Sequence, residues 1–208
     1  MSVITAIVRT DRWIEIEADG VPFLRLRRSV FRDLALREGD DLDPESFLRT
    51  DLPAAEYEPA LKAAVAFLAP RARAVQEIVK RLERSGYHEE AIRRVIERLE
   101  ALRFVGDERF AKEWAASRSG RALGKRRIQQ ELSHKGVDKE QIEDALSNLD
   151  PDILQAQALA LAIKLCAKYE KADKLERRGK VTQALVRRGF DWEQASKAYR
   201  DAEDSSLF

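Results

Sequence analysis

Few residues in this chain have side chains that could support catalysis or metal binding. The 208-residue sequence contains two histidines, His88 and His134, and one cysteine, Cys166, and none lies near another in the sequence. These residues do not form the close spacing of a zinc site. Cys166 ends the apolar segment Leu161–Cys166, which is typical of a half-buried thiol and not of a nucleophile. We therefore predict no catalytic residue, no metal ligand and no cofactor.

One segment superficially resembles a phosphate-binding loop. Gly120–Arg126 contains two glycines followed by Lys125, but it is one residue short and has Arg126 where serine or threonine would bind magnesium. It also follows a predicted helix and not a strand. Acidic residues on the predicted helices alternate with basic ones, as Glu90 and Arg94 do, which indicates solvated ion pairs. The sequence therefore favours a non-enzymatic binding protein.

Three basic windows contain no acidic residue: positions 20–32, 114–130 and 177–190. Any single window is equally compatible with a solvated helix face. The last two occupy equivalent places, at the start of the second helix in two copies of a repeat, which favours a shared basic stripe. Such a stripe would contact phosphates or an acidic protein groove. The candidate binding residues are Arg25, Arg27, Arg28, Arg118, Arg121, Lys125, Arg126, Arg127, Arg177, Arg178, Lys180, Arg187 and Arg188.

The elements that carry these residues are predicted to be helices of a repeated unit. Three segments align on a glycine, with leucine four residues before it and an apolar or aromatic residue directly after it; the glycines are Gly86, Gly136 and Gly189. Glycine adopts the left-handed conformation that ends many helices, and the next residue packs back against the last turn. Apolar residues with helical spacing continue on both sides of each glycine. Each glycine therefore marks the turn of a helix pair.

Each repeat is predicted to contain a third helix. The glycines are 50 and 53 residues apart, which is more than a two-helix unit needs, and residues 58–69, 107–119 and 151–170 have helical patterns. We expect three tandem three-helix repeats that form an elongated, curved array. The predicted divisions are a head over 1–52, repeats over 56–106, 107–149 and 150–203, and a tail over 204–208.

Side-chain caps are predicted where the last helix of each repeat begins. Asp138 and Asp191 can accept hydrogen bonds from the first turn, and Gln141 and Gln194 lie where a capping box requires them. His88 holds the aspartate's place in the first repeat and is a weaker cap. Aromatic residues near these helices are expected in the core and not in base stacking, with Trp114 and Trp192 left undecided; they are Tyr87, Phe104, Phe110, Phe190 and Tyr199.

The N-terminal head is predicted to be rich in β-structure. Residues 3–8 carry β-branched residues, and residues 13–17 and 21–27 alternate apolar and polar side chains around Asp19-Gly20, a strong hairpin signal. We expect a sheet of two or three strands, then a short helix around Ser29–Leu36. Turns are expected at Gly39–Asp41 and at Asp43-Pro44. Mainly helical structure with this small β-rich head is thus the predicted fold class.

The composition limits the cellular context and the kind of partner. Hydrophobic residues make up 44% of the chain and charged residues 36%, with a formal net charge of +1. That net charge gives no global attraction to nucleic acid, so any attraction must be local. The N-terminus lacks a signal-peptide pattern, no apolar stretch is long enough to span a membrane, and one cysteine fits a reducing compartment. We therefore expect a cytoplasmic protein with no membrane partner.

The repeat motifs resemble those of the RecX family, over roughly residues 60–202. The resemblance lies in the glycine-centred repeats, Asp107–Ala111, the segment from Gly124 to Gly136, and Leu185–Phe190. RecX proteins regulate the RecA recombinase, and the resemblance implies binding in the groove of the RecA–DNA filament. It also implies lower ATP hydrolysis, strand exchange and coprotease activity of RecA. Pro70, Ala74 and Gly106 depart from the family pattern.

The working hypothesis is a negative modulator of RecA that acts by occupancy, as a monomer, with weak and salt-dependent affinity for single- or double-stranded DNA. One alternative is a stand-alone DNA-binding protein, whose affinity would fall steeply with salt and need no RecA. A second alternative is a helical-repeat adaptor for another protein. That adaptor would bind neither DNA nor RecA.

Overall fold

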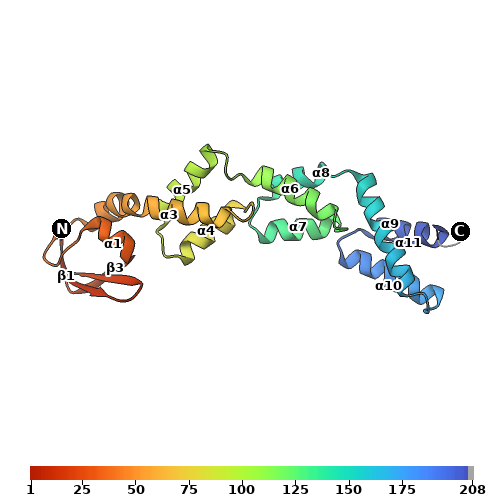
Figure 1. The fold of residues 1–208 in the computed structure, drawn as a ribbon, viewed down its shortest axis with the longest axis horizontal. Coiled ribbons are helices and arrows are strands. Elements are labelled where there is room, and N and C mark those ends of the chain that lie inside the picture. The colour runs from red at the N-terminus through yellow and green to blue at the C-terminus, as the bar shows by residue number, and fades with distance from the viewer. Residues whose placement is uncertain (206–208) are drawn as a thin grey trace. The chain divides into compact units, whose positions relative to one another are not determined.

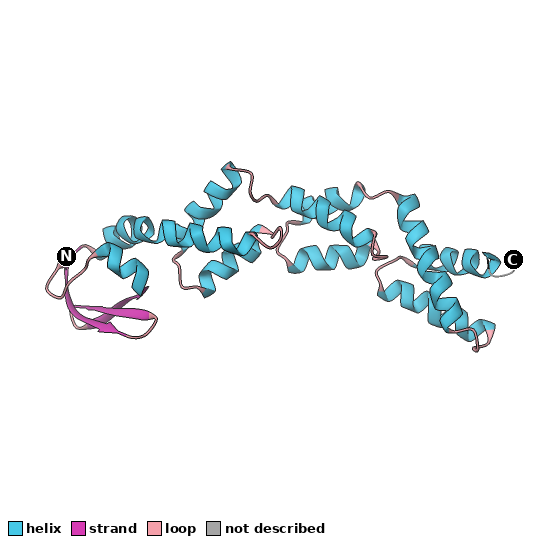
Figure 2. Ribbon diagram, in the orientation of Figure 1, coloured by secondary structure: helices cyan, strands magenta, loops and turns pink. Residues whose placement is uncertain are grey.

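The computed structural model describes residues 1–205, which form helices and a small sheet (Figures 1 and 2). The chain divides into two compact units, one from Met1 to Val105 and one that begins at Gly106. None of the described helices is both long enough and apolar enough to cross a membrane.

The head consists of an antiparallel sheet and three short helical segments. Its strands are β1 (Ser2–Arg9), β2 (Trp13–Ala18), β3 (Val21–Arg27) and β4 (Asp41–Leu42), in the order β3-β2-β1-β4. Its helical segments are α1 (Arg28–Leu34), α2 (Pro44–Ser46) and the π-helix η1 (Phe47–Asp51). The predicted hairpin is confirmed, because Asp19 and Gly20 both have positive φ between β2 and β3.

The sheet has one strand more than predicted. Ser2 pairs with Leu42, and Val3 pairs with Asp41, in a segment that the sequence marked only as turns. This strand is two residues long and depends on its pairing with β1, so no local pattern identifies it. Helix α1 also ends two residues early, because Ala35 adopts the left-handed conformation with φ 53°.

Within residues 1–205, nine further helices form the three predicted repeats. Repeat 1 contains α3 (Leu52–Leu68), α4 (Val75–Arg84) and α5 (Glu89–Ala101), and repeat 2 contains α6 (Asp107–Ser119), α7 (Lys125–His134) and α8 (Lys139–Ser147). Repeat 3 contains α9 (Pro151–Lys168), α10 (Lys174–Arg187) and α11 (Trp192–Ser205). The prediction of three helices in each repeat is therefore confirmed.

The repeated glycine ends the second helix of each repeat in the predicted way. Gly86, Gly136 and Gly189 have φ of 77°, 82° and 92°. In repeat 1 the Tyr87 amide donates to the Leu82 carbonyl at 3.2 Å, and the Gly86 amide donates to the Glu83 carbonyl at 2.7 Å. These are the two hydrogen bonds of a Schellman motif. The other two repeats form the same pair of bonds.

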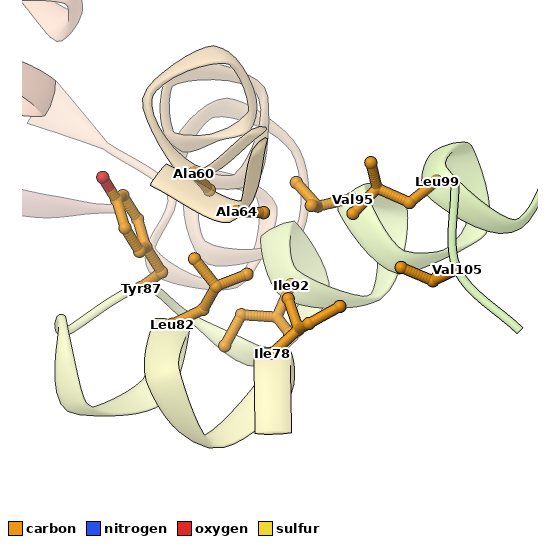
Figure 3. Close-up of a cluster of buried hydrophobic side chains, with 9 residues drawn as sticks. All are labelled: Ala60, Ala64, Ile78, Leu82, Tyr87, Ile92, Val95, Leu99 and Val105. Carbon is orange, nitrogen blue, oxygen red and sulfur yellow. The ribbon is translucent and has the colours of Figure 1, made fainter. Parts of the chain in front are cut away.

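The core of repeat 1 lies where its three helices meet (Figure 3). Ile78 and Leu82 of α4 and Val95 and Leu99 of α5 are fully buried. Helix α3 contributes alanines to this cluster, including Ala60, and these small side chains permit close approach of the helices. Burial of each Leu or Ile side chain contributes on the order of 2 kcal/mol. The apolar stripes read from the sequence therefore form the core of the repeat.

Helix α3 also contributes to the core of the head. Its first residue, Leu52, is fully buried in a cluster that includes Ile14, Leu26 and Phe47. The head therefore shares a helix with repeat 1, which supports a sheet too small to be stable alone.

The predicted caps are partly confirmed. In repeat 3 the Gln194 amide donates to Asp191 Oδ1 at 2.8 Å, and the Asp191 amide donates to Gln194 Oε1 at 3.3 Å, which is a capping box. The prediction for Asp138 was wrong: its exposed side chain makes no hydrogen bond to the first turn of α8.

The aromatic predictions hold except at Phe104. The side chains of Tyr87, Phe110, Phe190 and Tyr199 are buried as expected. Phe104 is 60% exposed, because it follows Arg103 in the left-handed conformation and the chain turns out of the helix there. The undecided pair separates: Trp114 is half-buried and stacks on Phe110, whereas Trp192 is 62% exposed.

Candidate basic binding surface

The start of α7 and the end of α10 are joined through their backbones. The Gly124 amide donates to the Arg188 carbonyl at 3.0 Å, and the Arg126 amide donates to the Gly189 carbonyl at 3.2 Å. A Cβ placed on Gly124 would lie 2.2 Å from backbone atoms of Gly189. We call this contact the 124–189 joint. Amides at the start of α7, which have no partner within their own helix, thus donate to carbonyls at the end of α10.

The joint brings two basic windows of the sequence together. Arg127 from one window and Arg187 and Arg188 from the other line a shallow pocket of 520 Å³ with Lys168, the last residue of α9. Tyr169 also lines this pocket, and its ring lies near the ammonium groups of Lys168 at 5.5 Å and Lys180 at 5.4 Å. We call the following set the joint surface: Lys125, Arg126, Arg127, Lys168, Tyr169, Lys180, Arg187 and Arg188.

Most cations of the joint surface lack an acidic partner. Within residues 1–205, no carboxylate oxygen lies within 4 Å of Arg126, Arg187 or Arg188, and all three side chains are exposed. Arg127 lies 3.8 Å from Glu131, and Lys180 lies 2.6 Å from Glu176, whose hydrogen bond raises the pKa of Lys180. The surface thus carries a local excess of positive charge that can attract phosphates or carboxylates.

Two other candidates have their charge matched within the chain. Arg118 lies 2.8 Å from Glu131 and covers the Trp114 ring, with 24% of its side chain exposed. Arg177 lies 3.2 Å from Glu203, with 25% of its side chain exposed. Both arginines therefore have little exposed, uncompensated charge to offer a ligand.

The remaining candidates of the second unit are exposed. Arg121 lies between α6 and α7, and Arg178 lies on α10, each without an acidic partner in the described part of the chain. Arg178 precedes Arg187 by nine positions, which places the two on opposite faces of an α-helix. Lys180 precedes Arg187 by seven positions and shares its face. The structure therefore brings Lys180, and not Arg178, to the face of α10 that carries Arg187.

The head arginines serve partly as structural contacts. Arg27 Nε donates to the Ser85 carbonyl at 2.5 Å, and its guanidinium lies 4.9 Å from the Tyr87 ring centroid. Arg25 lies 4.8 Å from the Trp13 ring centroid and 3.6 Å from Glu15. Arg28 is exposed, and no described carboxylate pairs with it. Arg27 thus links the head to repeat 1, while Arg28 remains available to a ligand.

Sequence reasoning missed Lys168 and Tyr169. They lie at the end of a long helix, outside the acid-free windows, and only the fold places them beside the joint. The segment that resembles a phosphate loop contains Gly124, whose role in this structure is to permit the backbone contact with Gly189.

His88 and Cys166 both contribute to the packing of their repeats. His88 Nδ1 lies 2.9 Å from Glu56 Oε1, within repeat 1. Cys166 is buried, and this burial raises the pKa of its thiol, which opposes a reactive thiolate. Among residues 1–205, His, Cys, Asp and Glu side chains form no group of three that could hold a metal ion.

Comparison with known proteins identifies the repeats. Residues 60–99, 107–146 and 152–199 match, in this order, the first, second and third three-helix domains of RecX. The chain is 33% identical over 193 residues to the regulatory protein RecX of Geobacillus thermodenitrificans, with 87% of this chain and 68% of that protein covered. It is 37% identical over 133 residues to the regulatory protein RecX of Prosthecochloris aestuarii, with 64% and 85% covered.

A solved structure agrees over nearly the whole chain. The crystal structure of a regulatory protein RecX superposes with a TM-score of 0.65 and 25% sequence identity, covering 98% of this chain and 100% of that one. Three findings agree: the similarity in sequence, the order of the three domains and the fold. The chain therefore belongs to the RecX family of regulatory proteins.

Proposed function

We propose that this chain is a negative modulator of the RecA recombinase that binds in the groove of the RecA–DNA filament. Binding there lowers the ATP hydrolysis, strand exchange and coprotease activities of RecA. Family membership supports RecA as the partner. The observation that carries the proposal within this chain is the joint surface, where the 124–189 joint brings exposed cations of repeats 2 and 3 close together.

The protein acts by occupancy and not by a chemical step. A filament groove presents phosphates of DNA and side chains of several RecA subunits. Exposed arginines can contact both, because their guanidinium groups bind phosphates and carboxylates with paired hydrogen bonds. Arg126, Arg187 and Arg188 are the side chains that we assign first to this contact.

The first experiment measures the single-stranded-DNA-dependent ATP hydrolysis of RecA while this protein is added at substoichiometric ratios. Strong inhibition well below one molecule per RecA supports action on the filament. Simple competition for DNA would need far more protein than these ratios supply. No inhibition by a folded sample contradicts the proposal.

Charge reversal tests the assigned surface. Lys125→Glu/Arg126→Glu/Arg127→Glu weakens inhibition by at least about tenfold, if each lost contact contributes roughly 0.5–1 kcal/mol. The matched control is Lys139→Glu/Lys197→Glu/Arg200→Glu, which changes charge equally in the same unit, at exposed positions outside the joint surface. Thermal unfolding verifies that both variants fold. Equal inhibition by the two variants contradicts the assignment of the surface.

The same unpaired cations favour a second candidate, direct binding to DNA without RecA. Fluorescence anisotropy with labelled single-stranded DNA over a salt series separates the two. Nanomolar affinity at physiological salt, with no effect on RecA at substoichiometric ratios, favours the stand-alone DNA-binding protein. Weak affinity that disappears with salt, together with strong inhibition of RecA, favours the modulator.

A further inference from the structure

The head contains a strongly acidic segment in a chain that is almost neutral overall. Residues 33–51 include seven acidic and two basic residues, a net charge of −5, whereas the whole chain carries +1. This segment directly follows the acid-free window 20–32. The head therefore separates its charges along the sequence, and the acidic part has no role in the surface described above.

Four of these carboxylates line one hollow of the head. The hollow has a volume of 610 Å³, and its aspartates come from different elements: Asp33 from α1, Asp41 from β4, Asp43 from the cap of α2 and Asp51 from η1. We call this hollow the head groove. The folding of segment 33–51 into these elements brings the four side chains to one rim.

Apart from Ser46, the residues that line the head groove beside its aspartates are apolar. Leu42 and Phe47 are buried beneath it, and Leu34 and Leu36 are half-buried at its side. Small side chains of α3, among them the exposed Ala54, leave room on the remaining wall. An apolar floor within an acidic rim is complementary to a ligand with apolar anchors and flanking positive charges.

Most of the rim charges are not neutralised within the part of the chain that the structure describes. Over residues 1–205, no basic side chain pairs with Asp41, Asp43 or Asp51 within 4 Å, while Asp33 has only an exposed contact with Arg32 at 3.7 Å. Asp43 accepts a hydrogen bond from the Glu45 amide at 3.3 Å. Asp51 ends a five-residue π-helix. Such helices are rare, and many of those known lie at functional sites. Like charges held around one hollow without counter-ions favour a cationic ligand.

We propose that the head groove docks a basic, amphipathic segment of a partner protein. Apolar side chains of the segment enter the hollow over Leu42 and Phe47, and lysine or arginine residues beside them pair with Asp41 and Asp51. Nucleic acid is excluded from this face, because its phosphates would be repelled by the four aspartates. The proposal goes beyond filament binding through the joint surface and is independent of it.

The test measures binding of a short fluorescent peptide to the full chain by anisotropy, without RecA or DNA. The probe carries leucines at helical spacing on one face and lysines and arginines on the other. A scrambled peptide of the same composition is the control for simple charge attraction. Saturable binding of the patterned peptide, at least about tenfold tighter than the scrambled one, supports a groove with apolar anchors.

Two variants locate the binding in the head groove. Asp41→Asn/Asp51→Asn removes two rim charges and weakens binding about tenfold, whereas Ala54→Arg places a cation in the hollow and abolishes measurable binding. The matched control is Asp11→Asn/Glu58→Gln, which removes two exposed carboxylates that do not line the groove.

The results separate specific docking from general attraction. Loss in both groove variants, with binding retained in the control, supports the proposal. Equal binding of the patterned and scrambled peptides overturns it, as does equal loss in the control. Ala54 is exposed on a helix, and arginine has a high helix propensity, so Ala54→Arg should fold. This variant keeps the test valid if the double variant fails to fold.

Discussion

The glycine turns of repeats 1 and 3 have the same local structure, but different groups pack against them. We call these groups the coverings of the turns. Gly86 and Gly189 both end a helix in a Schellman motif. A Cβ on Gly86 would lie 2.3 Å from the Trp13 ring, a side chain of the head. A Cβ on Gly189 would lie 2.3 Å from the Arg127 amide nitrogen, which belongs to the backbone of the neighbouring repeat. The same type of turn can therefore pack against either a side chain or a backbone segment.

The helix that follows each turn is also capped differently. In repeat 3 the cap is local, because Asp191 and Gln194 bond each other's amides. In repeat 1 the carboxylate of Glu56, from α3, accepts a hydrogen bond from the His88 amide at 2.8 Å. The Glu56 side chain has 0% exposure. A partner distant in sequence can therefore supply a cap where the local signal is missing.

Alanine substitution at the two glycines distinguishes the backbone covering from the side-chain covering, and it should cost the most stability. Gly189→Ala places a Cβ against rigid backbone and requires a left-handed alanine, which together lower the free energy of unfolding by about 3 kcal/mol or more. Gly86→Ala meets a side chain that can move, so we expect about 2 kcal/mol. Chemical denaturation measures both. Equal losses would show that the backbone covering is no more restrictive than the side-chain covering.

A double-mutant cycle sharpens this result. With Trp13→Ala in place, Gly86→Ala lowers the free energy of unfolding only by the cost of a left-handed alanine, about 1–2 kcal/mol. Additive losses in the cycle would contradict a direct contact between Trp13 and Gly86.

The next effect concerns the buried cap of repeat 1. Glu56→Ala leaves the His88 amide without its acceptor and opens a cavity, which lowers the free energy of unfolding by about 2–4 kcal/mol. Glu56→Gln retains an acceptor oxygen and costs less. Urea denaturation of both variants tests the order, and an alanine variant as stable as the glutamine variant would contradict the capping role.

The smallest effect compares the two local aspartates. Asp191→Ala removes a capping box and costs about 1 kcal/mol. Asp138→Ala removes a side chain that makes no cap bond, so its thermal midpoint remains within error of the unchanged protein. A similar loss at both sites would show that the two helices are capped alike in solution.

Features with a local signal were predictable from the sequence. The hairpin at Asp19-Gly20, the glycine turns and the third helix of each repeat follow from turn chemistry and helical spacing, which involve residues close in sequence. The β4 strand and the cap at Glu56 were not predictable, because each requires a partner more than thirty residues away.

The candidate site divides in the same way. The acid-free windows contain most cations of the joint surface, but equal charge patterns did not distinguish Arg126 from Arg118. The difference arises from packing, since Arg118 lies beside Glu131 and Trp114 while Arg126 faces solvent. Lys168 and Tyr169 belong to no window and join the surface only through the fold.

The 124–189 joint has a consequence for how such a surface can change. Its hydrogen bonds are made by backbone atoms at two glycines, so they do not use the side chains of Arg126, Arg187 or Arg188. Substitutions at Arg126, Arg187 and Arg188 can therefore alter affinity or partner choice while leaving the attachment intact. Substitutions on this surface can therefore produce new binding properties with little loss of stability.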